Sequence, residues 1–209
     1  TAENRRWGAG ALMFDGVDDY VSMADSDDWA FGQQFTIEMF VKIPDASPSS
    51  DVPFYNQHVD GDNRVLFRVQ GADLNFIVKD TTTVITLSSA HGMSSNTWHH
   101  LAVTRDSNDR VDIWVDGVSV GNVTDDSAIP NLAAAVNFGL DSGTSLYLDG
   151  IMDSTRIYSR ALSQAELLSN YNVGNIEIQT RSGATSDPND GTWEAWKPVT
   201  SETQIESMD

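Results

Sequence analysis

Apolar and polar residues alternate along much of the chain with the two-residue period of a β-strand. In FTIEMFVKI, residues 35–43, every second side chain is apolar, which turns one face of the strand toward a core. Phe40 lies on the opposite face, so that face is either partly covered or an apolar surface for a ligand. Similar short runs recur between turns rich in Gly, Asp, Asn and Ser, a spacing typical of an all-β sandwich or barrel. The predicted strands are Leu12–Phe14, Tyr20–Met23, Phe35–Ile43, Pro53–Gln57, Arg64–Val69, Leu74–Lys79, Thr83–Leu87, Trp98–Arg105, Arg110–Asp116, Val118–Val123, Ala135–Leu140 and Ser145–Tyr158, the last broken at Asp149-Gly150.

One segment, LSQAELLSNY at residues 162–171, has the signals of a helix. Ser163 and Glu166 have the spacing of a capping box, and Leu162 precedes the cap as a hydrophobic staple residue. The residues predicted to form its buried stripe are Leu167, Leu168 and Tyr171. A single helix of about two turns is too little for an α/β fold, so the predicted fold class is all-β.

Two adjacent histidines, His99 and His100, stand in the stretch WHHLAVTR and suggest a metal site at first sight. In a strand, however, neighbouring side chains point to opposite faces, so the two rings cannot bind one ion together. We therefore predict structural roles for both. The turn cluster at residues 106–109 and the Asp116-Gly117 pair predict hairpins on either side of the next strand.

The charge of the chain narrows the choice of partners. There are 31 acidic residues against 12 basic ones, for a net charge of -19. Such a surface repels nucleic acids and anionic lipids, so we predict no nucleic-acid partner. The sequence holds no run of 18 apolar residues, which predicts no membrane insertion, and no cysteine for disulfide or thiol chemistry. The excess of aspartate has two interpretations, solubility outside a cell and loop ligands for Ca²⁺.

Five stretches occur in the order and spacing of laminin G-like domains of the concanavalin A-like lectin/glucanase superfamily, which they resemble. They are ALMFDGVDDYVSM, FTIEMFVK, WHHLAVTRDSNDRVDIWVDGVSV, NFG and YLDGIMDSTRIYSRALSQAEL. The nearest likeness is to the prokaryotic surface-protein branch and its pentraxin relatives. The resemblance implies a two-sheet antiparallel jelly-roll sandwich over residues 1–172, with one short C-terminal helix. It also implies an extracellular recognition or adhesion module that binds carbohydrate or another surface ligand with the help of Ca²⁺.

Catalysis is not expected in this chain. Hydrolases that share the jelly roll carry two glutamates on one strand, with their carboxylates on either side of the scissile bond. No two of the seven glutamates here have that spacing within a predicted strand. Asp112 and Asp116 share a strand face, but Asp116 is a turn residue. The motifs of serine hydrolases and zinc proteases are also missing from the sequence.

The resemblance implies a first calcium position between an N-terminal and a C-terminal strand. Asp153 would supply its carboxylate there, while Asp15 and Gly16 would supply side-chain or backbone oxygens. The alternative is that Asp15-Gly16 and Asp149-Gly150 are simply turns.

A second calcium position is implied by the pentraxin likeness, in which Asp62, Asn63 and Asp141 match ligand positions. The acidic loop after Asp141 is shorter than in pentraxins, so one weak ion or none is expected rather than two. The alternative is a solvated turn at residues 60–63. A ligand would lie at the same edge of the sandwich, against the polar candidates Gln57, His58, Asp60, Asp62, Asn63 and Asp141.

The pattern changes after Tyr171. Residues 173–209 hold one good strand, 176–181, and a tryptophan pair, Trp193 and Trp196, and they resemble the start of a β-rich repeat of large prokaryotic surface proteins. Two or three strands cannot bury enough surface to fold alone. The tail therefore packs on its own sandwich, completes a sheet in a neighbouring copy, or begins a further module. Self-association through residues 173–209 would make the chain a structural subunit of a surface layer, filament or virion, which is the alternative function.

Overall fold

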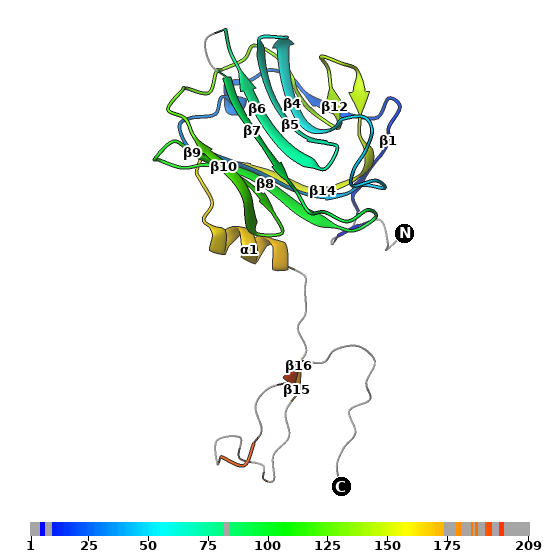
Figure 1. Cartoon of the computed structure of the whole chain (residues 1–209), viewed down its shortest axis with the longest axis vertical. Coiled ribbons are helices and arrows are strands. Elements are labelled where there is room, and N and C mark those ends of the chain that lie inside the picture. Colours follow the sequence, from blue (N-terminus) through cyan, green and yellow to red (C-terminus); the bar gives the residue numbers. More distant parts are fainter. Residues whose placement is uncertain are drawn as a thin grey trace. The chain divides into compact units, whose positions relative to one another are not determined.

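Two antiparallel sheets lie face to face and form the body of the molecule (Figure 1). The computed structural model describes residues 5–6, 10–81, 84–173, 179–180, 185, 187, 191–193 and 197–198. The strands of the two sheets and of a small hairpin beside them are β1 (Leu12–Asp15), β2 (Val21–Met23), β3 (Phe35–Lys42), β4 (Val52–Asp60), β5 (Asn63–Gln70), β6 (Asp73–Lys79), β7 (Val84–Ala90), β8 (His99–Arg105), β9 (Arg110–Val115), β10 (Val118–Thr124), β11 (Val136–Phe138), β12 (Leu140–Asp141), β13 (Leu146–Tyr147) and β14 (Asp149–Tyr158). The helical elements are the 3-10 turn η2 (Asp27–Trp29) and α1 (Gln164–Asn172).

Sheet A has the strand order β1-β14-β3-β8-β9-β10, and sheet B has the order β2-β11-β4-β5-β6-β7. The predicted all-β sandwich with one short helix is therefore confirmed. One detail of the prediction is wrong, because Asp149-Gly150 does not break the last strand but begins β14. Gly150 has φ +154, and a Cβ on it would lie 2.8 Å from the carbonyl oxygen of Lys42, so the glycine is needed for close strand packing rather than for a turn.

The core lies between the sheets and follows the predicted alternation. In β3 the side chains of Phe35, Ile37 and Met39 are fully buried in it. Phe40, on the outer face of sheet A, is also covered, with 1% of its surface exposed. Its ring packs against His100 at 4.9 Å between centroids, and the Arg6 guanidinium lies over it. Of the two readings of that face, the covered one is correct.

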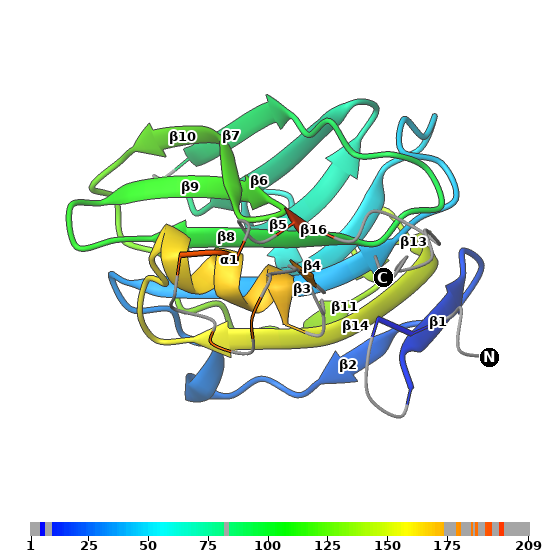
Figure 2. The same ribbon diagram turned by 90° about the horizontal axis from the view of Figure 1, so that it is seen from below.

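Helix α1 covers part of the outer face of sheet A (Figure 2). Its N-terminus has the predicted capping box, because the Ser163 N–H donates to Glu166 and the Glu166 N–H donates to the Ser163 hydroxyl. Leu162 and Leu167 are buried together, as a hydrophobic staple requires. The predicted stripe is wrong at Leu168, which is 43% exposed.

Replacing Ser163 with alanine removes the cap of the Glu166 N–H. We expect the free energy of unfolding to fall by about 1 kcal/mol, the usual value of an N-cap hydroxyl. Chemical denaturation followed by circular dichroism measures the change. The variant Ser163→Asp keeps an N-cap acceptor and is expected to stay close to wild type; equal losses in both variants would contradict the capping role.

The two histidines have separate structural roles, as predicted. Nδ1 of His99 lies 2.8 Å from the Asp116 carboxylate, while Nε2 of His100 lies 3.1 Å from Glu38 beneath helix α1. Asp116 and Gly117 both have positive φ, 53° and 77°, which is the turn geometry that a tight hairpin between β9 and β10 needs.

The chain divides into two compact units, Thr1–Tyr171 and Asn172–Asp209. In the second unit β15 (Gln179–Thr180) pairs with β16 (Lys197–Pro198). Most of the strand predicted at 176–181, and Trp196, lie outside the described residues. The linking role of residues 173–209 stays a prediction. In the part of the chain that the structure describes, no helix has the length and apolar character needed to cross a membrane.

Candidate functional site

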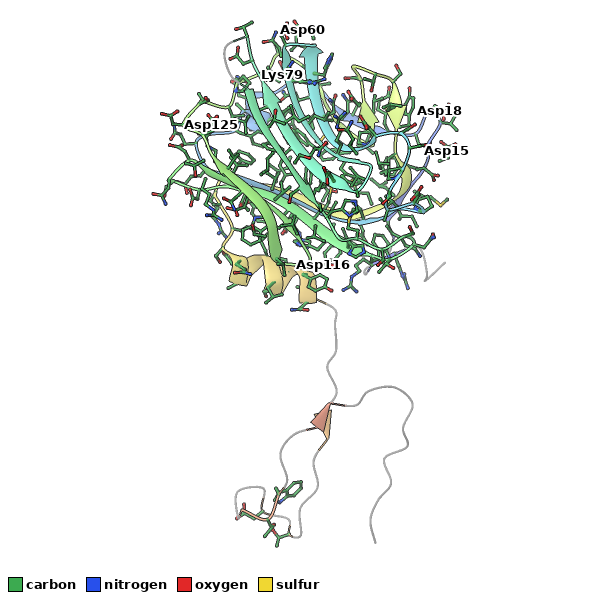
Figure 3. The ribbon with its side chains drawn as sticks, in the orientation of Figure 1. Asp15, Asp18, Asp60, Lys79, Asp116 and Asp125 are labelled. Atoms are coloured by element: carbon green, nitrogen blue, oxygen red, sulfur yellow. The ribbon has the colours of Figure 1, made fainter. Side chains whose placement is uncertain are left out.

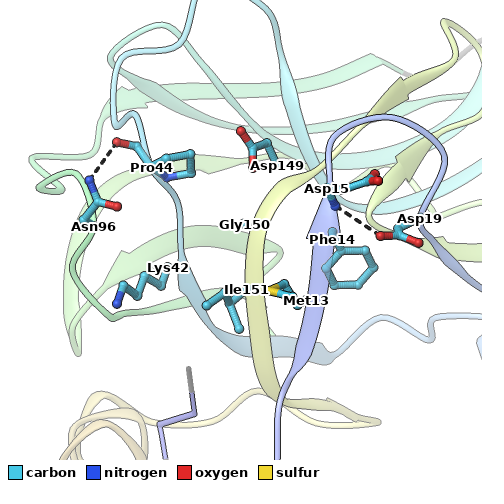
Figure 4. A pocket seen from close by; sticks show the side chains of 10 residues that line it. All are labelled: Met13, Phe14, Asp15, Asp19, Lys42, Pro44, Asn96, Asp149, Gly150 and Ile151. Carbon is cyan, nitrogen blue, oxygen red and sulfur yellow. Dashed lines mark hydrogen bonds between the residues drawn. The ribbon is translucent and has the colours of Figure 1, made fainter. Parts of the chain in front are cut away.

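Two adjacent pockets lie where β1 ends and β14 begins. One of about 500 Å³ is drawn in Figure 4 and the other, of about 580 Å³, opens beside the loop of residues 45–52. Asp15 and Asp149 line both pockets and are paired directly across the two strands. We call these two pockets the β1–β14 site. The Asp149 carboxylate makes no hydrogen bond with any described residue, so it is available to a ligand in either pocket.

Three carboxylates gather at the turn after β1. Ligand oxygens of Asp15, Asp18 and Asp19 all lie within 4.8 Å of one another, and all three residues are exposed. The turn is held by its own hydrogen bonds: Oδ1 of Asp15 accepts the Val17 N–H at 2.9 Å, and Asp19 accepts the Asp15 N–H at 3.2 Å. These are hard oxygen donors of the kind that Ca²⁺ prefers.

Gly16 allows this turn to form beside β14. It has φ +76, and a Cβ on it would lie 3.0 Å from the Cβ of Asp149. Its N–H donates to the Leu148 carbonyl oxygen at 2.9 Å. The Gly16 N–H is therefore already hydrogen-bonded, and the role of this glycine is to adopt the backbone conformation that the turn requires.

The structure does not bring Asp153 to Asp15. Because β1 and β14 are antiparallel, the partner of Asp15 is Asp149, and Asp153 lies four positions farther along β14, about 13 Å away. Its carboxylate accepts the Arg6 N–H at 2.9 Å and the Ser154 hydroxyl at 3.1 Å. The sequence-based pairing is thus corrected, with Asp149 in place of Asp153.

The residues predicted to bind a second calcium ion, Asp62, Asn63 and Asp141, also lie in different places. Asp62 and Asn63 lie at the tip of the β4–β5 hairpin, where Asp60 accepts the Asn63 amide at 2.8 Å and the Asp62 N–H at 2.9 Å. These hydrogen bonds hold the pKa of Asp60 below its ordinary value. Figure 3 shows Asp60 at a different end of the sandwich from Asp15 and Asp18.

Asp141 lies apart from that hairpin, buried under the loop between β12 and β13. Its Oδ1 accepts the Asn56 amide at 3.4 Å and the Gly143 N–H at 3.0 Å. Its Oδ2 is buried and has no hydrogen-bond partner among the described residues. Asn56 is four positions before Asp60 on β4, so Asp141 and Asp62 do not share a site.

Gln57 and His58 are neighbours on β4 and face opposite sides of sheet B. Gln57 is 1% exposed, and its amide donates to the carbonyl oxygens of Leu132 and Ala134. It is therefore a structural residue, and its predicted ligand contact is wrong. His58 faces outward, where its ring packs against Gly143.

An aromatic pair at the β1–β14 site was missed by sequence reasoning. Tyr147 lines the larger pocket, and its ring centroid lies 6.3 Å from that of Tyr20. Tyr20 is 49% exposed. An exposed ring beside carboxylates is the combination with which proteins hold sugars, whose hydroxyls donate hydrogen bonds while their CH faces pack on aromatic rings. Tyr20 precedes β2 and Tyr147 ends β13, so the two tyrosines are brought together by the fold and not by a local sequence pattern.

Glu38, on β3, is a fully buried ionisable residue outside the β1–β14 site. Its carboxylate is fully enclosed beneath helix α1, with contacts of 3.0 to 3.1 Å to His100, Arg156, Tyr158 and Asn170. Burial alone would raise its pKa, but these hydrogen bonds and the nearby positive charges lower it from 4.5 to about 2. A general acid needs a raised pKa, so the lowered pKa of Glu38 agrees with a structural role beneath helix α1.

Comparison with known proteins gives a match over most of the chain. The model of a family described as the concanavalin A-like lectin/glucanases superfamily matches residues 15–168. No curated protein sequence that was compared with the chain matches it significantly.

Three solved structures with a similar fold are domains of larger bacterial proteins, two of them with a bound sugar. Domain 4 of an extracellular GH43 arabinanase from Geobacillus stearothermophilus, in complex with arabinotriose, has a TM-score of 0.62 at 18% identity, covering 76% of this chain and 75% of that one. The CBM40 domain of the Ruminococcus gnavus IT-sialidase, bound to α2,3-sialyllactose, has a TM-score of 0.60 at 12% identity, covering 77% and 97%. The binding domain of botulinum neurotoxin serotype D has a TM-score of 0.61 at 12% identity, covering 80% and 45%. At these identities the likeness shows the fold alone.

Proposed function

Since the chain belongs to the concanavalin A-like lectin/glucanase superfamily, we propose that it is a non-catalytic, extracellular carbohydrate-binding module. Its ligand is a neutral oligosaccharide bound at the β1–β14 site with the help of Ca²⁺. The solved domains in complex with arabinotriose and bound to α2,3-sialyllactose support a carbohydrate ligand, and the extracellular arabinanase supports a secreted or surface location.

The observation that carries the proposal is the pair of pockets that meet at Asp149. This carboxylate is free to accept hydrogen bonds from sugar hydroxyls, and Tyr147 offers a ring for a sugar face. The volume of each pocket lies within the range of small-ligand sites, about 300–1,000 Å³. They also lie beside the turn with three carboxylates, so a cation and a sugar would be neighbours.

Calcium fits this turn by distance. Two oxygens bound to one Ca²⁺ at about 2.3–2.6 Å each are up to about 5 Å apart, and the oxygens of Asp15, Asp18 and Asp19 lie within 4.8 Å. Waters would complete the shell. Bound there, Ca²⁺ would offset most of the negative charge of the turn and present an electrophilic centre to sugar hydroxyls. Asp141 is the candidate ligand of a second ion, because its buried Oδ2 lacks a donor.

Wild-type protein is expected to bind at least one neutral oligosaccharide, arabinotriose being the first to try, and to bind it more weakly in a chelator. Replacing Asp149 with asparagine keeps the shape but removes a charged acceptor, so affinity should fall about tenfold or more. Isothermal titration calorimetry measures both effects.

The control is Asp126→Asn, which removes one exposed carboxylate near Asp125, on the opposite side of the sandwich from Asp15 in Figure 3. It should bind as wild type does. Absence of binding to every neutral glycan with and without Ca²⁺, or unchanged binding by Asp149→Asn, would contradict the proposed site.

A further inference from the structure

A row of basic side chains crosses the outer face of sheet B. In β5 the side chains of Val65 and Phe67 enter the core, so Arg64 faces outward. The strand register sets Arg64 directly between His58 of β4 and Lys79 of β6. We call His58, Arg64 and Lys79 the cationic row. Figure 3 shows Lys79 at the same end of the sandwich as Asp60, away from Asp15.

Arg64 and Lys79 lie directly opposite one another on adjacent strands, and two positive charges in that position destabilise a sheet unless an anion lies near them. The chain has 31 acidic residues, and elsewhere on the same face a cation does have its acid: Arg68 forms an ion pair with Asp51. Arg64 lies between His58 and Lys79 although the chain has many carboxylates that could stand beside it. This placement suggests that Arg64 binds an anion.

Lys79 has partners for its charge, whereas Arg64 has none among the described residues. Lys79 reaches Asp62 at 3.7 Å and the Gly61 carbonyl oxygen at 3.4 Å. Arg64 makes no hydrogen bond or ion pair with any residue that the structure describes, and its Nε is buried without an acceptor. The nearest acid turn is closed on itself, since Asp60 is engaged by Asn63 and the Asp62 N–H. Buried polar atoms are normally paired, and no residue that the structure describes supplies the acceptor that Arg64 lacks.

The surroundings of Arg64 strengthen such a contact. The next row on the same face holds Leu66, fully buried, and Ile77, 8% exposed. A charged hydrogen bond beside apolar side chains is less screened by water than one on an open surface. A guanidinium also offers two parallel N–H groups that match the two oxygens of a carboxylate.

We propose that Arg64, flanked by His58 and Lys79, binds the carboxylate of an acidic sugar at a second site on the outer face of sheet B. A uronic or sialic acid residue is the source of carboxylate that agrees with the proposed glycan binding, on which the choice of ligand class rests. Neutral sugar units then occupy the β1–β14 site, and acidic units occupy the cationic row.

Calorimetry of the full-length chain with trigalacturonate and with its methyl ester tests the proposal, because the ester has the same sugars without the charge. The wild type should bind the acid at least tenfold more tightly than the ester, with an advantage that shrinks at high salt. Arg64→Met should abolish the preference. Arg64→Lys should keep part of it, since lysine keeps the charge without the fork. Arg160→Met, which removes one exposed cation paired with Glu166, should keep all of it.

The experiments distinguish failure of the β1–β14 site from failure of the second site. Acid binding that survives Asp149→Asn supports the second site, even if the wild type binds no neutral glycan. Acid binding lost in Asp149→Asn places the acidic sugar at the β1–β14 site and overturns the proposal. So does an undiminished preference in Arg64→Met, a wild type that does not distinguish acid from ester, or binding of a sulfated disaccharide without binding of trigalacturonate.

Discussion

Replacing Glu38 with glutamine is expected to lower the free energy of unfolding by about 3 kcal/mol, since removing one partner of a buried ion pair leaves the others uncompensated. Glu38 is buried, and in the variant Arg156 would lose its counter-charge and His100 the carboxylate that it contacts. The Asn170 amide donates to both carboxylate oxygens and would lose an acceptor. The hydrogen bonding between helix α1 and strand β3 would be weakened as a result. Differential scanning calorimetry should show a fall in melting temperature on the order of 10 °C.

The pH dependence of this loss has a defined sign. The pKa of Glu38 is lowered from 4.5 to about 2 in the folded protein. Its contribution to stability is therefore complete above pH 4.5 and disappears as the pH falls toward 2. The stability difference between wild type and Glu38→Gln should shrink over that interval. Glu166→Gln is the matched control, because its carboxylate is 43% exposed and glutamine also serves in a capping box. A similar loss in both variants would contradict a special role for burial.

The second large effect is expected at Arg105, whose side chain is fully buried. Its guanidinium donates to the carbonyl oxygens of Ser127 and Asp125 at 2.7 and 3.0 Å and to the Asp109 carboxylate at 2.9 Å. Arg105→Met would leave these three acceptors without a donor. We expect a loss of about 3–5 kcal/mol in the free energy of unfolding, measured by urea denaturation.

Two further variants define the origin of that effect. Arg105→Lys keeps the charge but cannot reach three acceptors at once, so an intermediate loss is expected. Arg160→Met removes an exposed arginine and should change stability little. Hydrogen exchange should rise first at residues 106–109 and 125–127 in the Arg105 variants. If hydrogen exchange instead rises uniformly across sheet A, Arg105 does not specifically stabilise these two loops.

Local patterns were enough to predict most of the fold. Alternation in β3, the turn residues Asp116-Gly117 and the capping box at Ser163 each depend on a few neighbouring side chains, and each is found as expected. The opposite orientation of His99 and His100 follows from the same geometry. Arg105 carried a similar signal that was not used, since it shares the core face of β8 with Val103.

The candidate site could not be predicted from local sequence patterns, because it depends on how distant strands pair. Whether Asp15 meets Asp149 or Asp153 is a question of register between strands far apart in the chain. Irregular pairing between Pro53 and Tyr55 lets both Phe54 and Tyr55 enter the core, and it decides that Gln57 points inward. Such shifts change which face a residue occupies without any local mark.

The position of β14 in sheet A has a consequence for biosynthesis. β14 lies between β1 and β3, so β1 has no other strand beside it until nearly the whole first unit has left the ribosome. Before that moment the edge of β3 and the Asp15 turn are open to wrong pairing. A nascent chain halted before β14 is therefore the form of this protein most in need of a chaperone.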